Sequence, residues 1–338
     1  MKKSFRNCVI LFAVALLAAM AWGTEQVDAA SQVRINSQNF PDKAIRKVAR
    51  SYDKNKNGYL SPKEISKIKK VRLDKPGGEM ITNYKGLERF TNLRVLHCCE
   101  AGMKSKKEIT LDLSKNKKLE QLRLGYYNLE NLESNVTKLK LTNCKKLKTL
   151  DVTGVSRLKT LDVKGCVALK EMSISYSKRL TTLDVSSCHK LERLLVFESK
   201  KLSQLKLGTI NKLERLDLRY CPALKTLDLG KQTKLKELSV SNAPTRKLNV
   251  KNNVRLEALY LYRVPVTELN LKKQSRLKGV QIYAPKLKRL NLTGTKITKE
   301  RCISEPNFYY CCIYNKNVTV VLADGEKMIS PVDSYDWK

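Results

Sequence analysis

Residues 139–163 read LKLTNCKKLKTLDVTGVSRLKTLDV, and leucine returns at the same place every eleven residues, at Leu139, Leu150 and Leu161. Each of these anchors belongs to a unit of the form L-x-x-L-x-L/V. Less regular anchors come first, at Leu96, Leu111 and Leu122, and the regular series continues at Met172, Leu183, Leu194, Leu205, Leu216, Leu227, Leu238, Leu248, Leu259, Leu269, Val280 and Leu290. A short fixed period is typical of a solenoid, which grows by stacking and needs no single globular core.

Each unit has room for one short strand and one corner, but not for a strand and a helix. The alternation in Leu150-Asp151-Val152 is the period of a half-buried strand. Two units then make one coil of 21 or 22 residues, and the strands of successive coils stack into two parallel sheets. Face A is anchored at Leu150, Met172, Leu194, Leu216, Leu238, Leu259 and Val280, and face B at Leu161, Leu183, Leu205, Leu227, Leu248, Leu269 and Leu290. The predicted fold is a mainly β repeat solenoid with parallel sheets on two faces.

The spacing resembles that of the leucine-rich-repeat family, and more closely a bacterial subclass whose 21-residue repeats consist of two related halves. The resemblance covers roughly Leu87 to Leu292. It implies recognition of a protein or another ligand on a sheet face. Three prolines, Pro244, Pro265 and Pro285, fit this scheme, because each falls in the corner after a face A strand, where a fixed φ suits a tight turn.

The chain begins with a basic segment and an uncharged apolar run from Val9 to about Trp22. This run is short for a membrane span and is typical of a secretory signal peptide, assigned to residues 1–30. Cleavage after Ala21 and cleavage after Ala30 both fit. No other segment is apolar enough to span a bilayer, so we expect a secreted or cell-surface protein. The order of a short F-P-D segment at Phe40–Asp42, one calcium-loop motif and leucine-rich repeats is similar to that of bacterial surface proteins, and this resemblance implies a Gram-positive source.

The segment Asp53–Glu64 has the twelve-residue form of an EF-hand calcium loop and resembles that family. Gly58 takes the sixth position, where the loop turns sharply. The resemblance assigns the calcium ligands to Asp53, Asn55, Asn57, Tyr59 through its carbonyl, Ser61 and Glu64. The entering helix is expected over residues 40–51 and the leaving helix over 64–71. Only two ligands are acidic, so binding should be weak, and the alternative is an Asx-rich loop that binds no ion.

The sequence contains ten cysteines, and nine follow the predicted signal peptide. Cys144, Cys166 and Cys188 each lie five residues after a face B anchor, so they are expected to stack in one column. We interpret them as buried thiols that fill a small corner site. The Cys188-His189 pair suggests a catalytic dyad, but no orienting third group or oxyanion donor accompanies it, so no enzyme is predicted.

The two faces differ in their outward residues. Face B carries a polar ladder that we interpret as a solvated surface: Asp162, Asp184, Lys206, Asp228, Asn249, Asn270 and Asn291. Face A carries large apolar groups, at Tyr176, Leu195, Phe197, Tyr220, Tyr260, Tyr262 and Tyr283. Exposed aromatic groups on a rigid face often mark a recognition surface, although they can also turn inward or stack only on each other.

The formal charge is +35, and part of the excess follows the repeat. Seven residues after successive face B anchors stand Lys146, Ala168, Lys190, Lys212, Lys234, Arg255 and Arg276. Such a column repels itself, which suggests an anionic partner such as a wall polymer, a glycan or extracellular nucleic acid. A generally lysine-rich surface is the alternative. A dedicated nucleic-acid target is disfavoured, because no base-reading motif is present.

The boundaries predicted from these patterns are residues 1–30 for the signal peptide, 31–75 for the EF-hand-like segment, 76–298 for the solenoid and 299–338 for a capping hairpin. The hairpin pairs residues 308–314 with residues 318–322. The resulting hypothesis is a non-catalytic extracellular scaffold for binding or adhesion, with weak structural calcium. The alternative is a structural wall protein held by charge, without a specific ligand.

Overall fold

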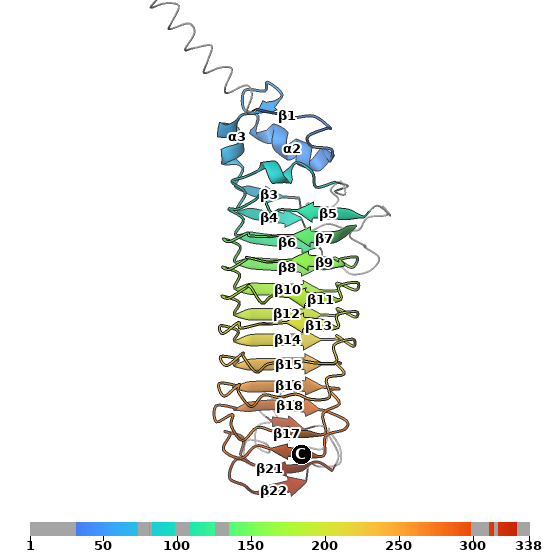
Figure 1. Cartoon of the computed structure of the whole chain (residues 1–338), viewed down its shortest axis with the longest axis vertical. Coiled ribbons are helices and arrows are strands. Elements are labelled where there is room, and N and C mark those ends of the chain that lie inside the picture. Colours follow the sequence, from blue (N-terminus) through green and yellow to red (C-terminus); the bar gives the residue numbers. More distant parts are fainter. Residues whose placement is uncertain are drawn as a thin grey trace, which may run out of the picture.

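The computed structural model describes residues 32–73, 81, 83–98, 108–125, 135–298, 311–313 and 317–329. The predicted signal peptide lies outside these residues. The described chain forms a long stack of coils with a small helical unit at its N-terminal end (Figure 1). The predicted β-solenoid is therefore confirmed.

One continuous parallel sheet of eleven strands runs the length of the stack. Its strands, in spatial order, are β3 (Lys70–Arg72), β4 (Val95–Cys98), β6 (Gln121–Gly125), β8 (Thr149–Thr153), β10 (Glu171–Ser175), β12 (Arg193–Phe197), β14 (Arg215–Arg219), β15 (Glu237–Ser241), β16 (Ala258–Tyr262), β18 (Gly279–Tyr283) and β20 (Cys311–Ile313). The register joins the predicted anchors directly, since Leu150 lies opposite Met172 and Met172 opposite Leu194. This sheet is face A, and it extends further at both ends than the regular repeat does.

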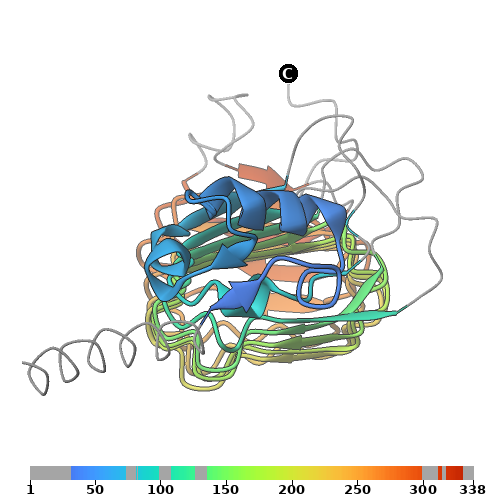
Figure 2. The same ribbon diagram turned by 90° about the horizontal axis from the view of Figure 1, so that it is seen from above.

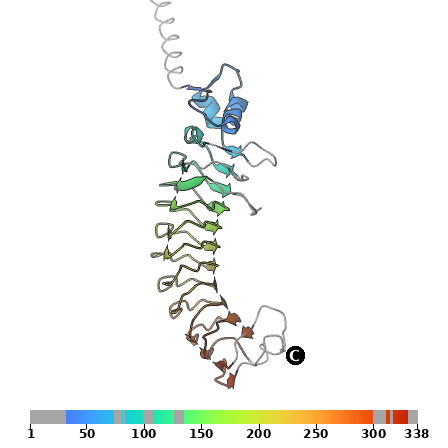
Figure 3. The same cartoon turned by 90° about the vertical axis from the view of Figure 1, so that its right-hand side faces the viewer.

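Face B is built from shorter strands in three separate sheets. These are β5 (Ile109–Asp112) with β7 (Val136–Lys140) and β9 (Thr160–Asp162); β11 (Thr182–Asp184) with β13 (Gln204–Lys206); and β17 (Glu268–Asn270) with β19 (Arg289–Asn291), β21 (Thr319–Val321) and β22 (Lys327–Ile329). Leu227 and Leu248, which were expected to anchor face B strands, lie in no strand. The stack is bent, and the continuous face A sheet lines the inner, concave side (Figure 3).

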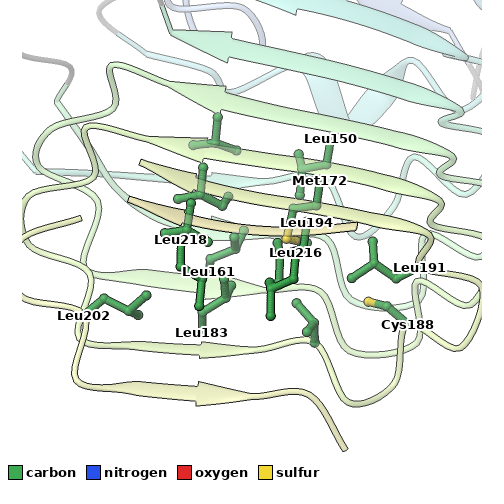
Figure 4. Close-up of a cluster of buried hydrophobic side chains, with 14 of the residues drawn as sticks. Leu150, Leu161, Met172, Leu183, Cys188, Leu191, Leu194, Leu202, Leu216 and Leu218 are labelled. Atoms are coloured by element: carbon green, nitrogen blue, oxygen red, sulfur yellow. The ribbon is translucent and has the colours of Figure 1, made fainter. Parts of the chain in front are cut away.

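The core lies between the two faces. Anchors of both faces point inward and meet in a layer of leucine side chains, as Leu150, Met172 and Leu194 do opposite Leu161 and Leu183 (Figure 4). Almost every anchor is excluded from solvent. At about 25 cal/mol per Å² of buried apolar surface, this repeated burial is the main force holding the coils together.

A small unit covers the N-terminal end of the stack (Figure 2). It consists of β1 (Val33–Arg34), helix α2 (Lys43–Tyr52), β2 (Tyr59–Leu60), helix α3 (Pro62–Lys67) and, further along, the 3₁₀ helix η1 (Leu87–Arg89). Asp42 caps α2 and Ser61 caps α3. The ring of Phe40 stacks on that of Phe90, with centroids 5.9 Å apart, and so fixes the unit to the first coil.

Two details of this unit differ from the sequence prediction. The leaving helix was expected to continue to Val71, but α3 ends at Lys67 and the chain enters the large sheet as β3 at Lys70. The helix ends early because Val71 lies opposite Leu96 and serves as an anchor of the large sheet, so that residues 70–72 alternate exposed and buried as a strand does. The solenoid sheet therefore begins inside the segment that was assigned to the EF-hand-like unit.

The expected hairpin between residues 308–314 and 318–322 is wrong. β20 pairs in parallel with β18 on face A, whereas β21 pairs in parallel with β19 on face B, so the two strands form one more coil. The hairpin lies one strand later, between β21 and β22, with Gly325 in the left-handed region (φ +94°) at its turn. Alternating apolar residues fit a further coil as well as a hairpin, which is why the pattern alone did not separate the two.

Candidate functional site

The concave sheet is electrically balanced, although the chain as a whole is strongly basic. Across strands β4 to β18, the outward positions carry four arginines and four carboxylates. All eight are ion-paired: Arg123 with Asp151 at 3.3 Å, Arg193 with Glu171 at 3.6 Å, Arg215 with Glu237 at 2.6 Å, and Arg219 with Asp217 at 2.5 Å. The aromatic residues of this face were predicted from the sequence, whereas its ion pairs were not, because ion pairing depends on the strand register.

A shallow depression of about 520 Å³ lies on this sheet, over strands β4 to β14. It is lined at one end by His97 and at the other by Arg219, and Leu195 contributes an apolar side chain near its middle. The lining therefore mixes paired charges with apolar surface, a composition that suits a partner offering both polar and apolar groups.

Aromatic side chains line one edge of the concave sheet, where its strands end. Tyr176, Phe197 and Tyr220 form one cluster, in which the Phe197 ring meets each tyrosine ring edge-on at centroid distances of 5.1 and 5.7 Å. Tyr262 and Tyr283 form a second cluster, with centroids 5.3 Å apart. The rings do stack on each other, yet Tyr220 and Tyr262 each keep 44% of their surface exposed. We call these five residues the aromatic edge.

The backbone at this edge is unusual. The residue after each strand from β8 to β16 on face A takes a left-handed conformation, which glycine provides at Gly154 (φ +76°) and asparagine at Asn242 (φ +50°). Tyr176 and Tyr220 occupy the same position, with φ of +58° and +56°. Bulky residues avoid this region, so the tyrosines are kept there against the local preference of the backbone.

The remaining predicted residues of face A lie on the sheet itself. Leu195 on β12 and Tyr260 on β16 point outward at the middle position of their strands, and both are half-buried. The guanidinium of Arg263 lies over the Tyr262 ring, 5.3 Å from its centroid. The structure thus brings Tyr260, Tyr262 and Tyr283 together on neighbouring strands, next to a fixed cation.

The predicted basic column lies along the corner that leads into the face A strands. Five of its members are exposed and Lys234 is half-exposed, and the set comprises Lys146, Lys190, Lys212, Lys234, Arg255 and Arg276. Lys212, followed by Arg255, lowers the pKa of the Lys234 ammonium, so these three side chains lie close enough to repel each other. Among the described residues, no member of the column has a carboxylate within ion-pair distance.

A second ladder of charges separates this column from the concave sheet, and it contains both cations and carboxylates. Its ion pairs join neighbouring coils: Arg94 with Glu120 at 3.2 Å, Lys148 with Glu120 at 3.5 Å, Lys170 with Glu192 at 3.2 Å, Lys236 with Glu214 at 3.0 Å, and Lys278 with Glu257 at 3.0 Å. We call it the paired ladder. Two parallel rows of charge therefore follow the same corner, and only one of them is compensated.

The polar residues of face B have a structural role that the sequence analysis missed. The side-chain oxygen of Asp162 accepts the N–H of Lys164 at 2.9 Å, and that of Asp184 accepts the N–H of Ser186 at 3.0 Å. Asp228, Asn249, Asn270 and Asn291 make the same contact, each with the residue two positions on. These Asx turns guide the chain out of each face B strand, so the ladder is more than a solvated surface. An Asx residue placed just after an anchor was the available signal.

The calcium-loop residues are folded into a closed loop. Gly58 has a φ of +81°, and its N–H donates to Asp53 Oδ2 at 2.9 Å. Across the loop, Glu64 Oε1 accepts the N–H of Lys54 at 2.8 Å, and Oε2 accepts that of Ser61 at 2.9 Å. Burial opposes ionisation of Glu64, but these donors outweigh it and lower the pKa of the carboxyl.

In the part of the chain that the structure describes, no second loop of this kind pairs with the Asp53–Glu64 loop, and its short strand pairs with β1 instead. β2 holds Leu60, the eighth loop residue, and pairs with β1 through Val33 opposite Leu60. No three His, Cys, Asp or Glu side chains gather as a metal site in the described chain. The loop nevertheless offers the oxygens of Asp53, Asn55 and Asn57, which, with a carbonyl and Glu64, fit the preference of calcium for oxygen ligands.

The cysteine column is confirmed as a set of buried thiols. Cys144, Cys166 and Cys188 are fully buried and unbridged. Burial raises the pKa of their thiols to about 11, 12 and 12 respectively. His189 is exposed. Cys188 therefore stays a thiol at neutral pH and lacks the thiolate that a nucleophile requires.

Among the described residues, no helix is both long and apolar enough to cross a bilayer. No model of a known protein family matches the sequence, and no curated protein does either.

Several solved structures are similar in their coil arrangement. The functional domain of InlJ from Listeria monocytogenes, described as including a cysteine ladder, is 20% identical, with 86% of this chain and 72% of that chain covered and a TM-score of 0.41. The internalin InlF from the same organism is 15% identical, with 88% and 93% covered and a TM-score of 0.34. A leucine-rich-repeat protein from Leptospira interrogans is 16% identical, with 70% and 93% covered and a TM-score of 0.24. Identity and overlap are low in all three cases. By its own coils and anchors, the chain is a β-solenoid built from leucine-rich half-repeats.

Proposed function

We propose that this chain is a non-catalytic extracellular binding scaffold of bacterial origin, whose concave sheet and aromatic edge bind a protein partner. The observation that carries the proposal is the contrast in charge. A chain of formal charge +35 keeps its concave sheet balanced and places exposed tyrosines along the edge of that sheet. Interfaces favour aromatic groups and arginine and are depleted of lysine, and the outward positions of β4 to β18 share these three features, although they also carry four carboxylates.

The strained tyrosines support this choice of surface. Glycine and asparagine hold the same corner position in other coils at lower conformational cost, as Gly154 and Asn242 do. Tyr176 and Tyr220 therefore take this conformation at a higher cost than glycine or asparagine would, as Glu198 and Arg263 do in two other coils. Large rings that are already ordered by mutual stacking lose little entropy on binding, which suits them as anchors for a partner.

The test is a saturable binding measurement. Partners are first selected from displayed extracellular proteins on the immobilised chain, and each is then titrated against variants. Tyr220→Ala and Tyr262→Ala should weaken binding tenfold or more, as expected of interface anchors. Lys206→Ala on face B serves as control, because Lys206 makes no Asx turn. A purely structural wall protein would give no saturable partner, and a loss confined to Lys206→Ala would place the site on the wrong face.

Calcium binding by the Asp53–Glu64 loop is a second part of the proposal. The closed loop and the ionised Glu64 support it, since oxygen ligands around a calcium ion must be charged or polar. α3 leads directly into β3, so an ion held by Glu64 would stiffen the junction between the cap and the first coil.

An anionic polymer is the second candidate partner, and the basic column favours it. Elsewhere along the same corner the chain pairs its charges, as in the paired ladder, but it leaves the column without carboxylates. Export through the predicted signal peptide would bring this column to the cell surface, where wall polymers of a Gram-positive bacterium or host glycans supply negative charge. Such contacts could also retain the protein at the surface.

A further inference from the structure

The basic column runs along the axis of the solenoid. Its members stand on successive coils, and their order follows the pairing of β12, β14, β15, β16 and β18. From Lys190 to Arg276 every coil contributes one cation, whereas Ala168 interrupts the column before Lys146. Four steps of ~4.8 Å between hydrogen-bonded strands give the uninterrupted run a length of about 19 Å.

The column is bounded on one side. The paired ladder lies between it and the concave sheet and presents carboxylates at Glu192, Glu214 and Glu257. The two rows are close neighbours, because Glu214 acts on the charge of Lys234 and Arg276 acts on that of Glu257. A polyanion crossing from the column onto the concave sheet would meet these carboxylates together with the lysines that neutralise them. One lying along the column would meet cations only.

We infer that the uninterrupted run from Lys190 to Arg276 binds a linear polyanion lengthwise, with the polymer parallel to the axis of the solenoid. This inference rests on the anionic-polymer part of the proposed function and adds the orientation and the length of the ligand. Each coil neutralises about one anionic group, so the stacking of the repeat sets the number of contacts. The protein-binding concave sheet remains free while the polymer is bound.

A gain-of-function pair of variants tests the orientation. Ala168→Lys fills the gap and joins Lys146 to the run, whereas Val167→Lys adds the same charge one residue away, at a site that is already 39% exposed. With a single-stranded oligonucleotide as probe, five contacts predict a slope of about −3.5 for log affinity against log salt concentration. Ala168→Lys should steepen that slope by about 0.7 and tighten binding. Val167→Lys should change both clearly less.

A loss-of-function pair and a length series complete the test. Lys234→Ala should make the slope shallower by about 0.7, and Lys251→Ala, at an exposed position outside the column, should not. Affinity should rise steeply with probe length until the probe spans the run of about 19 Å, and only slowly beyond.

Equal effects of Ala168→Lys and Val167→Lys, or of Lys234→Ala and Lys251→Ala, would overturn the lengthwise orientation and leave general charge attraction. The absence of any salt-sensitive binding by the parent chain would instead overturn the polymer function itself. Circular dichroism of each variant checks that its coils are folded. The gain-of-function variant adds a further safeguard, because unfolding would not be expected to tighten binding.

Discussion

The thiol of Cys166 donates to the main-chain carbonyl oxygen of Leu141 in the preceding coil, with sulfur and oxygen 3.2 Å apart. Further along the same column, Asn253 Nδ2 makes the equivalent contact with the carbonyl of Leu229 at 3.1 Å. Gln274 Nε2 does so with Val250 at 2.9 Å. The amide oxygens of Asn253 and Gln274 are buried without a hydrogen-bond partner. In these coils the site uses a donor and no acceptor, so cysteine, asparagine and glutamine can replace one another in it, whereas Ile210 fills the same position without a donor.

The first prediction follows from this exchange of donors. Asn253→Ala should lower the free energy of unfolding by about 2 kcal/mol, because two buried hydrogen bonds, to Leu229 and Gln232, are lost. Asn253→Cys should cost clearly less, since the thiol keeps a donor and removes the unpaired oxygen. Urea unfolding midpoints measure both. Equal losses would show that packing, and not hydrogen bonding, decides the residue at this position.

The second prediction concerns alkaline pH. Burial holds the thiol pKa values of Cys144, Cys166, Cys188 and Cys221 at about 11 to 12, above their ordinary value of 9.0. The folded chain then binds more protons than the unfolded chain above pH 9, so stability is fully present below that pH and falls as pH rises toward 12. Cys166→Ala should flatten this fall. A melting temperature that stays constant between pH 9 and 11 would contradict it.

Calcium supplies the third prediction. Free calcium at a concentration ten times its dissociation constant should raise the free energy of unfolding of the parent chain by about 1.4 kcal/mol. Glu64→Gln and Asp53→Ala should abolish that gain, while Asp324→Asn, in the turn before β22, should keep it. Differential scanning calorimetry with calcium and with a chelator provides the comparison. Identical traces for the parent chain would mean that the loop binds no calcium.

The strained corner gives a fourth prediction. Tyr220→Asn should alter stability by less than about 1 kcal/mol, because relief of the left-handed backbone offsets the lost contact with Phe197. Binding of a concave-face partner should nevertheless fall. Thermal unfolding and titration of the same variant separate the two effects. A large loss of stability would make Tyr220 a folding residue and weaken its assignment to the interface.

A fifth prediction concerns the column. Lys212 is the main cause of the lowered pKa of Lys234, so Lys212→Ala should raise that pKa toward the ordinary lysine value. Lys251→Ala, outside the column, is the matched control. The ¹³Cε shift of Lys234 in a pH titration reports the change. An unchanged pKa would mean that the two ammonium groups do not face each other in solution.

The repeat made much of the fold predictable. Anchors such as Leu150 and Met172 recur at a fixed spacing, and burial leaves a stack as the only arrangement that covers them all. The position of Cys166 in the column followed from the same spacing. The lengthwise basic column could also be read from the sequence, because a period is enough to place residues on one line.

Features that depend on hydrogen bonding between coils were not predictable in this way. The ion pair between Arg215 and Glu237 requires the register of β14 against β15. The loss of strand at Leu227 and Leu248 has no counterpart in their spacing, which stays regular. The left-handed conformation of Tyr220 runs against the preference of its own side chain, so local propensity pointed elsewhere.

The missing strands at Leu227 and Leu248 have a mechanical consequence. On the inner side, the hydrogen bonds from β4 through β18 run without a break and resist extension. On the outer side, the ladder is open between β13 and β17, where a hollow of about 610 Å³ is bordered by Leu227 and Pro244. Fewer hydrogen bonds therefore join neighbouring coils on the outer side of this stretch than on its inner side, so the bending stiffness of the stack should be uneven along its length.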